Sequence, residues 1–294
     1  MAVFGAGTAP VVWTFAVSHR FQAHRGLALG LVLSGTGVCA AVVPKLAAWA
    51  LAGPAGWRGA YFCLASAPLL LTVPLVLFGL RMPFTSRPKA EPARAGGLGL
   101  REALRTAQFW ILVTSTLAIY SGGAGLIFNL VPFLTDQGLS LAEATDLAAI
   151  LGVSSIVSRL ASGALADRFW APGVSAFLVL TAGLAVCSLA GTGVSRAMAV
   201  AVAVALGLVA GAELDLLAFM TARYFGLAAY GRIYGTFFSI LAVAGGAAPL
   251  IFARLHPQVA VPLVGGLLLA GGCLVLLMGP YPQRGPATAT SERT

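Results

Sequence analysis

Apolar residues are grouped in long runs along this chain, and short polar or Gly/Pro-containing segments separate the runs. Nine of these runs are long enough to cross the hydrocarbon core of a bilayer, which takes about 20 helical residues. They are 2–17, 27–51, 60–80, 110–134, 144–165, 174–193, 197–222, 233–255 and 259–278. The pattern predicts an all-α membrane protein with about nine transmembrane helices.

One connection between the runs is much longer than the others. Residues 81–108 contain three prolines, two adjacent glycines and six basic residues, a composition typical of a solvated linker. Within it, residues 100–107 could form a short surface helix. We therefore expect three helices in 1–80, a linker over 81–108, a six-helix bundle over 109–280 and a disordered polar tail over 281–294.

The basic residues predict the orientation. If the runs alternate in direction and the first one enters the cytoplasm, 13 of the 18 Lys and Arg lie on the inner side and three on the outer side. Cytoplasmic loops of membrane proteins carry such an excess. We expect the linker and the carboxy terminus to be cytoplasmic. The first run then starts outside, so we also expect further helices upstream of Met1.

Composition excludes several classes of protein. Apolar residues make up 59% of the chain and charged residues 9%, whereas soluble domains carry about a quarter charged residues. The net charge of +9 is scattered, which argues against a nucleic-acid partner. The four cysteines are isolated and no catalytic cluster is evident, so we expect no enzyme activity, no metal and no cofactor. The expected partners are the bilayer and a small solute, with no obligatory protein partner.

Four charged residues fall inside apolar runs and away from the ends of those runs: Lys45, Arg159, Glu213 and Asp215. Each costs at least about 2.5–3.5 kcal/mol at the bilayer centre, so each is a candidate functional residue. Arg159 precedes Asp167 by eight residues, which places it about 12 Å from the inner surface. Its guanidinium suits a carboxylate, and the alternative is a structural ion pair. Lys45 lies near the outer interface, where a lysine reaches the headgroups.

Asp215 precedes Arg223 by eight residues and lies at the same depth as Arg159. It could pair with Arg159 in an empty site and take up a proton when an anion displaces it. Glu213 lies about 200° around the same helix and cannot face the same way. We prefer Asp215 over Glu213 as the cavity-facing acid for proton coupling. The alternative is that both acids serve packing and gating near Arg223.

Further candidates lie at the ends and bends of the helices. Tyr120 and Asn129 flank a Gly-Gly pair that lets a helix bend, and either side chain could bind a substrate oxygen. Asp167 and Arg168 end a run at the inner face. The Asp167 carboxylate could stabilise the amino end of a nearby helix, such as the one that begins near Gly26, and so hold an inner gate shut. The alternative is an ordinary topological anchor.

Three segments carry a family resemblance. The fourth to sixth helices of the major facilitator superfamily resemble FAVSHRFQAHRGLALGLVLSGTGVCAAVVP together with GWRGAYF. The loop after the eighth helix of that superfamily resembles GALADRF. Its tenth and eleventh helices resemble GAELDLLAFMTARYFGLAAYGRIYG. The pattern is most similar to its monocarboxylate-carrier and oxalate/formate-antiporter branch. Ser155 stands where animal carriers of that branch have an acidic residue. On this mapping the chain holds helices four to twelve and lacks the first three.

The resemblance implies a function and further residue roles. It implies secondary transport of small organic anions by proton symport or anion exchange, with Arg159 holding the anion and with Tyr120 and Asn129 on a cavity-lining helix. Arg232 would be a gating residue whose partner lies in the absent amino-terminal loop. The expected location is a bacterial inner membrane. The alternatives are a truncated, transport-inactive fragment and an exporter of another small solute.

Overall fold

The computed structural model describes residues 26–35, 56–74, 97–189 and 195–282, with a few isolated positions between 14 and 54. The named elements among them are all helices. Most of the first predicted span, about half of the second, Lys45, much of the linker and the tail beyond residue 282 lie outside the described residues. The described chain divides into two compact units, residues 1–34 with 95–294 and residues 35–94.

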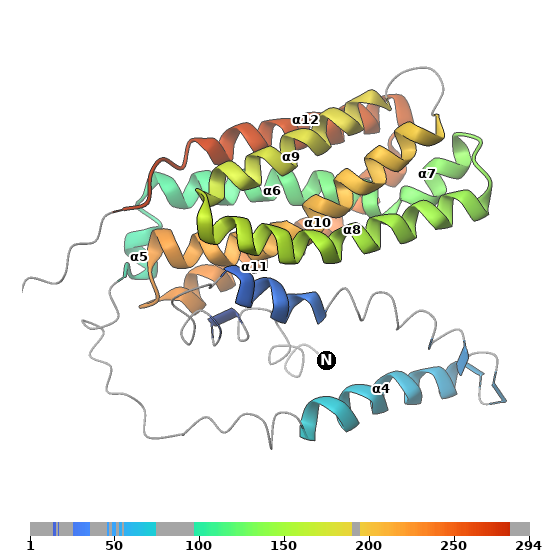
Figure 1. Ribbon diagram of the computed structural model, residues 1–294, viewed down its shortest axis with the longest axis horizontal. Coiled ribbons are helices and arrows are strands. Elements are labelled where there is room, and N and C mark those ends of the chain that lie inside the picture. The colour runs from blue at the N-terminus through green and yellow to red at the C-terminus, as the bar shows by residue number, and fades with distance from the viewer. Residues whose placement is uncertain are drawn as a thin grey trace, which may run out of the picture. The chain divides into compact units, whose positions relative to one another are not determined.

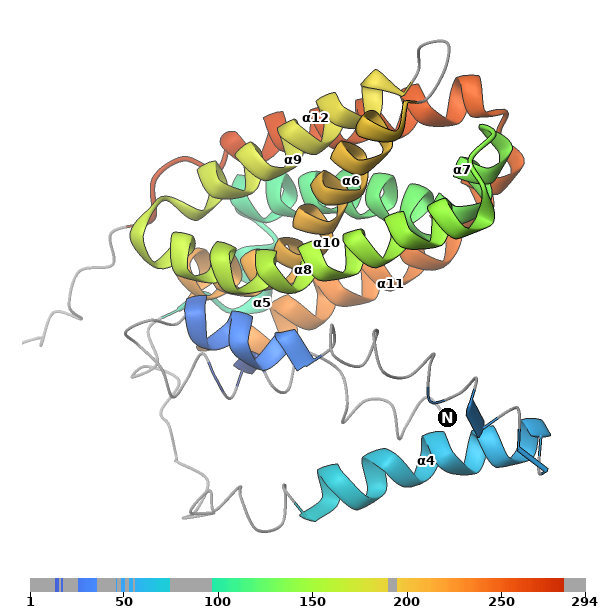
Figure 2. The same cartoon turned by 45° about the vertical axis from the view of Figure 1, so that its right-hand side comes forward.

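Six helices of the first unit are long and apolar enough to cross a membrane. They are α6 (Ala107–Phe128), α8 (Leu141–Arg168), α9 (Ala171–Ser188), α10 (Arg196–Phe225), α11 (Tyr230–Arg254) and α12 (Pro257–Leu276). Each overlaps one of the six runs predicted after the linker, which confirms the all-α membrane class. Successive helices run in opposite directions (Figures 1 and 2). We call the two ends of this bundle the α5 end and the α7 end, after the short helices α5 (Leu100–Ala103) and α7 (Leu130–Asp136).

Side-chain caps fix where several of the helices begin. The Thr106 side chain accepts the backbone N–H of Phe109 at the start of α6. The predicted surface helix over 100–107 is therefore shorter in the structure, where α5 ends at Ala103. Ser140 and Glu143 form a reciprocal capping box at the start of α8, and Ser195 caps α10. Each cap satisfies N–H groups that a helix leaves free at its amino end.

The fourth predicted run is broken in the structure. The prediction of one helix over 110–134 was wrong: α6 ends at Phe128, Asn129 leaves the helical region with φ −106° and ψ 12°, and α7 begins at Leu130. Pro132 explains the break, because it has no N–H to donate to the Phe128 carbonyl and its ring crowds that position.

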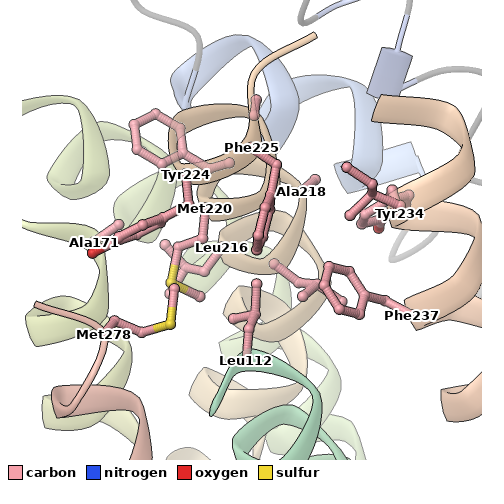
Figure 3. Close-up of a cluster of buried hydrophobic side chains, with 14 of the residues drawn as sticks. Leu112, Ala171, Leu216, Ala218, Met220, Tyr224, Phe225, Tyr234, Phe237 and Met278 are labelled. Carbon is pink, nitrogen blue, oxygen red and sulfur yellow. The ribbon is translucent and has the colours of Figure 1, made fainter. Parts of the chain in front are cut away.

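The bundle has two buried hydrophobic clusters, and the one near the α5 end includes residues of α6, α10 and α11 (Figure 3). Leu112 of α6, Leu216 of α10 and Phe237 of α11 converge there and are almost fully buried. Many other large apolar side chains point outward, among them Phe128, Phe177 and Val243, each about 70% exposed or more. A soluble protein seldom exposes apolar surface on that scale, and lipid is the solvent that suits it.

The second unit contains α4 (Gly56–Pro74), which overlaps the third predicted span, 60–80, and begins before it. At its amino end the rings of Trp57 and Tyr61 meet edge to face, with centroids 6.1 Å apart. The Arg58 guanidinium lies 4.5 Å from the centre of the Trp57 ring. The division of the chain into four parts stays a prediction: 1–80, 81–108, 109–280 and 281–294.

Candidate functional site

The site starts from the close packing of α8 on α10. Gly207 and Gly211, one turn apart on α10, face the backbone carbonyls of Leu151 and Ser155 on α8, where a Cβ on either glycine would overlap those atoms. Small residues let two helix backbones approach in this way. Ser158 reinforces the contact by donating its hydroxyl to the Leu208 carbonyl.

One turn beyond this contact, the two helices bring Arg159 and Asp215 together. Arg159 Nη1 donates to Asp215 Oδ1 at 2.9 Å. The described residues contain this single ion pair. Side-chain exposure is 11% for Arg159 and 2% for Asp215. The equal depths of the two residues predicted this pairing. Arg159 Nε and Asp215 Oδ2 are also buried, and neither has a hydrogen-bond partner among the described residues.

Glu213 faces a different region, as its angular separation from Asp215 predicted. Its side chain lines a small cavity between α6, α9 and α10, with Ile119 and Ser175 among its neighbours. Glu213 Oε1 is buried and has no hydrogen-bond partner within the described chain. Asp215, rather than Glu213, is therefore the acid that contacts Arg159.

The helix Gly26–Gly35 packs on α8 through backbone contacts. A Cβ on Gly26 would overlap the Gly163 carbonyl, and a Cβ on Gly30 would overlap the Arg159 carbonyl. Gly26 and Gly30 are one turn apart, and so are Gly163 and Arg159, so one face of each helix forms the contact. On α8 this contact at the Arg159 carbonyl lies one turn from the contact between the Ser155 carbonyl and Gly211 of α10.

Asp167 caps the same helix. Its Oδ1 accepts the backbone N–H of Gly26 at 2.8 Å and its Oδ2 accepts that of Leu27 at 3.1 Å. A carboxylate at this position satisfies two free N–H groups and faces the positive end of the helix dipole. This is the contact that the sequence led us to expect for Asp167, and it lies at the α5 end of α8.

The other candidate residues are dispersed. Tyr120 is half-buried on α6 and packs against Gly245 of α11. Asn129 donates its side-chain amide to two backbone carbonyls, of Gly125 at 2.9 Å and of Pro249 at 3.1 Å.

Three arginines are exposed at the α5 end, away from the Arg159–Asp215 pair: Arg168, Arg223 and Arg232. Arg223 lies over the rings of Phe219 and Tyr281 at 5.3 and 5.7 Å. Arg232 forms no ion pair with a described residue.

Comparison with known proteins identifies the family. A family model described as Major Facilitator Superfamily matches residues 1–249. The chain belongs to this superfamily. It is 31% identical to Monocarboxylate transporter 11 of Mus musculus over 95% of this chain and 55% of that protein. It is 32% identical to MFS-type transporter pytF of Aspergillus terreus over 52% of this chain and 50% of that protein.

A third relative is Monocarboxylate transporter 13 of Bos taurus, which is 31% identical over 66% of this chain and 42% of that protein. The chain spans about half the length of these curated relatives. These matches confirm the resemblance to the monocarboxylate branch of the Major Facilitator Superfamily. The chain is a multi-pass membrane protein of this superfamily.

In this Major Facilitator Superfamily chain, sequence reasoning missed two groups of tyrosines. Tyr234 of α11 is fully buried, donates its hydroxyl to the Leu214 carbonyl at 3.4 Å, and lies within electrostatic reach of Arg159 and Asp215. Its ring stacks on that of Tyr230. A tyrosine inside an apolar run is the signal that could have found it, because a buried hydroxyl needs a partner.

The second missed group, which we call the tyrosine clasp, joins Trp170, Tyr224, Gly279 and Tyr281. Trp170 Nε1 donates to the Tyr224 hydroxyl and the Gly279 carbonyl, both at 3.2 Å, and the Tyr224 hydroxyl donates to the Gly279 carbonyl at 2.6 Å. The Tyr281 hydroxyl accepts the N–H of Ala171 at 2.9 Å. These hydrogen bonds connect the start of α9 with the ends of α10 and α12 at the α5 end.

Proposed function

We propose that this chain carries small, monocarboxylate-like organic anions by proton symport or anion exchange, with Arg159 as the anion-binding residue. The observation that carries the proposal is the buried Arg159–Asp215 pair. A charge buried in a span is costly, so a pair retained there points to a function beyond stability. The names of the relatives from Mus musculus and Bos taurus support a carboxylate as the substrate.

The geometry of the pair supports exchange of one carboxylate for another. Asp215 Oδ1 occupies one donor of the Arg159 guanidinium, and the buried Nε beside it has no described partner. A substrate carboxylate could take two parallel hydrogen bonds from the planar fork, which a lysine cannot provide. Binding of that anion displaces Asp215, which then accepts a proton in the symport version of the mechanism.

The cap at Asp167 suits the gate of such a transporter. Helix Gly26–Gly35 contacts the backbone of Arg159 through Gly30 and the carboxylate of Asp167 through Gly26. A movement that separates this helix from α8 therefore breaks the cap and opens the backbone contact beside Arg159 in one step. Substrate binding at Arg159 and opening at the α5 end are coupled through this shared contact.

The test uses the purified full chain, with binding and transport measured separately. Stabilisation against heat by lactate reports binding in detergent, and uptake of labelled lactate into proteoliposomes reports transport. Arg159→Lys keeps the charge and removes the fork, so we expect roughly tenfold weaker binding. Arg168→Lys, an exposed arginine nine residues further along α8, is the control and should leave binding unchanged.

The outcomes separate the alternatives. Unchanged lactate affinity in Arg159→Lys contradicts the anion-binding role. A wild-type chain that neither binds nor takes up lactate contradicts the proposed substrate class. For coupling, Asp215→Asn should abolish the pH dependence of uptake, with Glu213→Gln as the companion variant. If uptake keeps its pH dependence in both variants, neither acid carries the proton.

A further inference from the structure

A groove runs along the bundle between α11 and α12. Both helices pack on α6 and have almost no backbone contact with each other along their described lengths. Gly125 of α6 forms part of the floor, Ala244, Ala247 and Ala248 of α11 form one wall, and Leu263 of α12 contributes to the other. The groove encloses about 600 Å³ of empty space, and its lining is almost wholly apolar.

A second pocket, of about 920 Å³ and with a half-polar lining, adjoins the groove at the α7 end. Phe252 and Leu255 line both spaces, so the two lie side by side. Asp136, Arg254 and His256 line this second pocket. His256 Nδ1 accepts the N–H of Gln258 at 3.4 Å, which leaves its Nε2 as a donor toward other groups.

These three polar residues offer both signs of charge without neutralising each other. The described residues contain one ion pair, Arg159–Asp215, so Asp136 and Arg254 share the pocket unpaired. Arginine and histidine donors suit a phosphate group, and a carboxylate suits an ammonium group. A ligand that carries a phosphate and an ammonium close together therefore complements the pocket.

The length of the groove matches one half of a bilayer. Ala244 precedes Arg254 by ten residues, which is about 15 Å along α11. The hydrocarbon core is about 30 Å thick, so the groove extends from the headgroup level to near the bilayer centre. An acyl chain has this length, is apolar throughout, and fits a long narrow groove.

We propose that this surface binds one phospholipid with a phosphate and a primary ammonium in its headgroup, as in phosphatidylethanolamine. One acyl chain lies in the groove between α11 and α12. The phosphate lies against Arg254 and His256, and the ammonium donates to Asp136. A small carboxylate would use Arg254 alone and would leave both the apolar groove and Asp136 without a partner, so the lipid is the better occupant.

Native mass spectrometry of the full chain tests the proposal. The purified protein is released from detergent in the presence of phosphatidylethanolamine, phosphatidylcholine or phosphatidylglycerol with the same acyl chains. We expect one retained lipid, with phosphatidylethanolamine favoured over phosphatidylglycerol roughly tenfold, as for one hydrogen bond to a charged group. Asp136→Asn should remove this preference, whereas Asp146→Asn, an exposed acid on α8, should not.

A second variant tests the groove. Ala247→Trp fills it and should abolish retention of the lipid, whereas Leu184→Trp on the exposed face of α9 should leave retention intact. Circular dichroism checks that both variants keep their helices. Retention by Ala247→Trp at the wild-type level, or equal retention of all three lipids by the wild type, would overturn the proposal. Competitive displacement of the lipid by lactate would also overturn it, because the pocket would then belong to the substrate path.

Discussion

The Asp167 carboxylate accepts the backbone N–H of Gly26 at 2.8 Å, across 141 residues of sequence. This bond joins the end of α8 to the start of helix Gly26–Gly35, and it lies one turn from the contact between Gly163 and Gly26. The packing of the two helices therefore depends on the side chain of Asp167 and on the absence of side chains at Gly26 and Gly163. Both features can be changed one at a time.

Removal of the cap should loosen helix Gly26–Gly35. Asp167→Ala leaves the N–H groups of Gly26 and Leu27 without their acceptor, and loss of such a cap costs about 1 kcal/mol. Hydrogen exchange by mass spectrometry should therefore show faster exchange over 26–30. Arg168→Ala, at the neighbouring exposed position, should leave exchange unchanged. Equal protection in wild type and Asp167→Ala would show that the cap does not hold this helix.

Added bulk at the glycine contact should separate the same two helices. Gly163→Ala places a Cβ against the Gly26 backbone, and overpacking of this kind costs about 1–3 kcal/mol. Gly152→Ala is the matched control on α8, because no atom lies within 4 Å of its added Cβ and alanine favours a helix by up to about 1 kcal/mol. Thermal unfolding in detergent should thus move in opposite directions for the two variants. A shift of the same sign in both would contradict the close contact.

Disruption of one partner of the buried ion pair should cost more than removal of both. Asp215→Ala leaves the Arg159 guanidinium buried without its carboxylate, which typically costs about 3–5 kcal/mol. In Arg159→Leu/Asp215→Leu no charge remains, and the bundle should recover most of that loss. Unfolding titrations of the single and double variants measure the difference. If the double variant is the less stable of the two, the pair is a net stabilising element and its functional interpretation weakens.

Partial burial of the Tyr281 hydroxyl makes the tyrosine clasp sensitive to alkali. Burial raises the pKa of Tyr281 above the ordinary 10.0, so the neutral hydroxyl is the form that the fold favours. Its contribution is complete below pH 10 and is lost as pH rises through the raised pKa. Tyr281→Phe should lower stability by about 1 kcal/mol at neutral pH and should lack this alkaline loss. Thermal unfolding between pH 7 and 11 measures both effects, with Tyr61→Phe on exposed α4 as control.

The sequence predicted those features of the site that depend on position along a helix. Equal spacing of Arg159 from Asp167 and of Asp215 from Arg223 gives equal depth, because the helical rise is constant, and that predicted the pair. The position of Asp167 at a helix end predicted the cap. Neither argument needs to know how the helices cross, since depth in a membrane is one coordinate that the sequence supplies directly.

Features that depend on lateral packing were not predictable in the same way. The tyrosine clasp joins residues 170, 224 and 281, which no periodicity relates. Tyr234 of α11 reaches the Leu214 carbonyl only because α11 packs against α10. The break at Asn129 was also missed, although Pro132 signals it. An apolar run of 25 residues was long enough to suggest one helix, and the proline was treated as tolerable within a span.

The break at Asn129 leads to the last prediction. Asn129 was expected to bind a substrate oxygen, yet its amide nitrogen donates to Gly125 and to Pro249, so it links the break between α6 and α7 to the proline of α11. Asn129→Ala removes two hydrogen bonds of about 1 kcal/mol each. We expect a lower unfolding temperature and faster hydrogen exchange in α7, with lactate affinity unchanged. Gln137→Ala, at the exposed end of α7, should change neither quantity. A loss of lactate affinity without a loss of stability would instead place Asn129 in the substrate site.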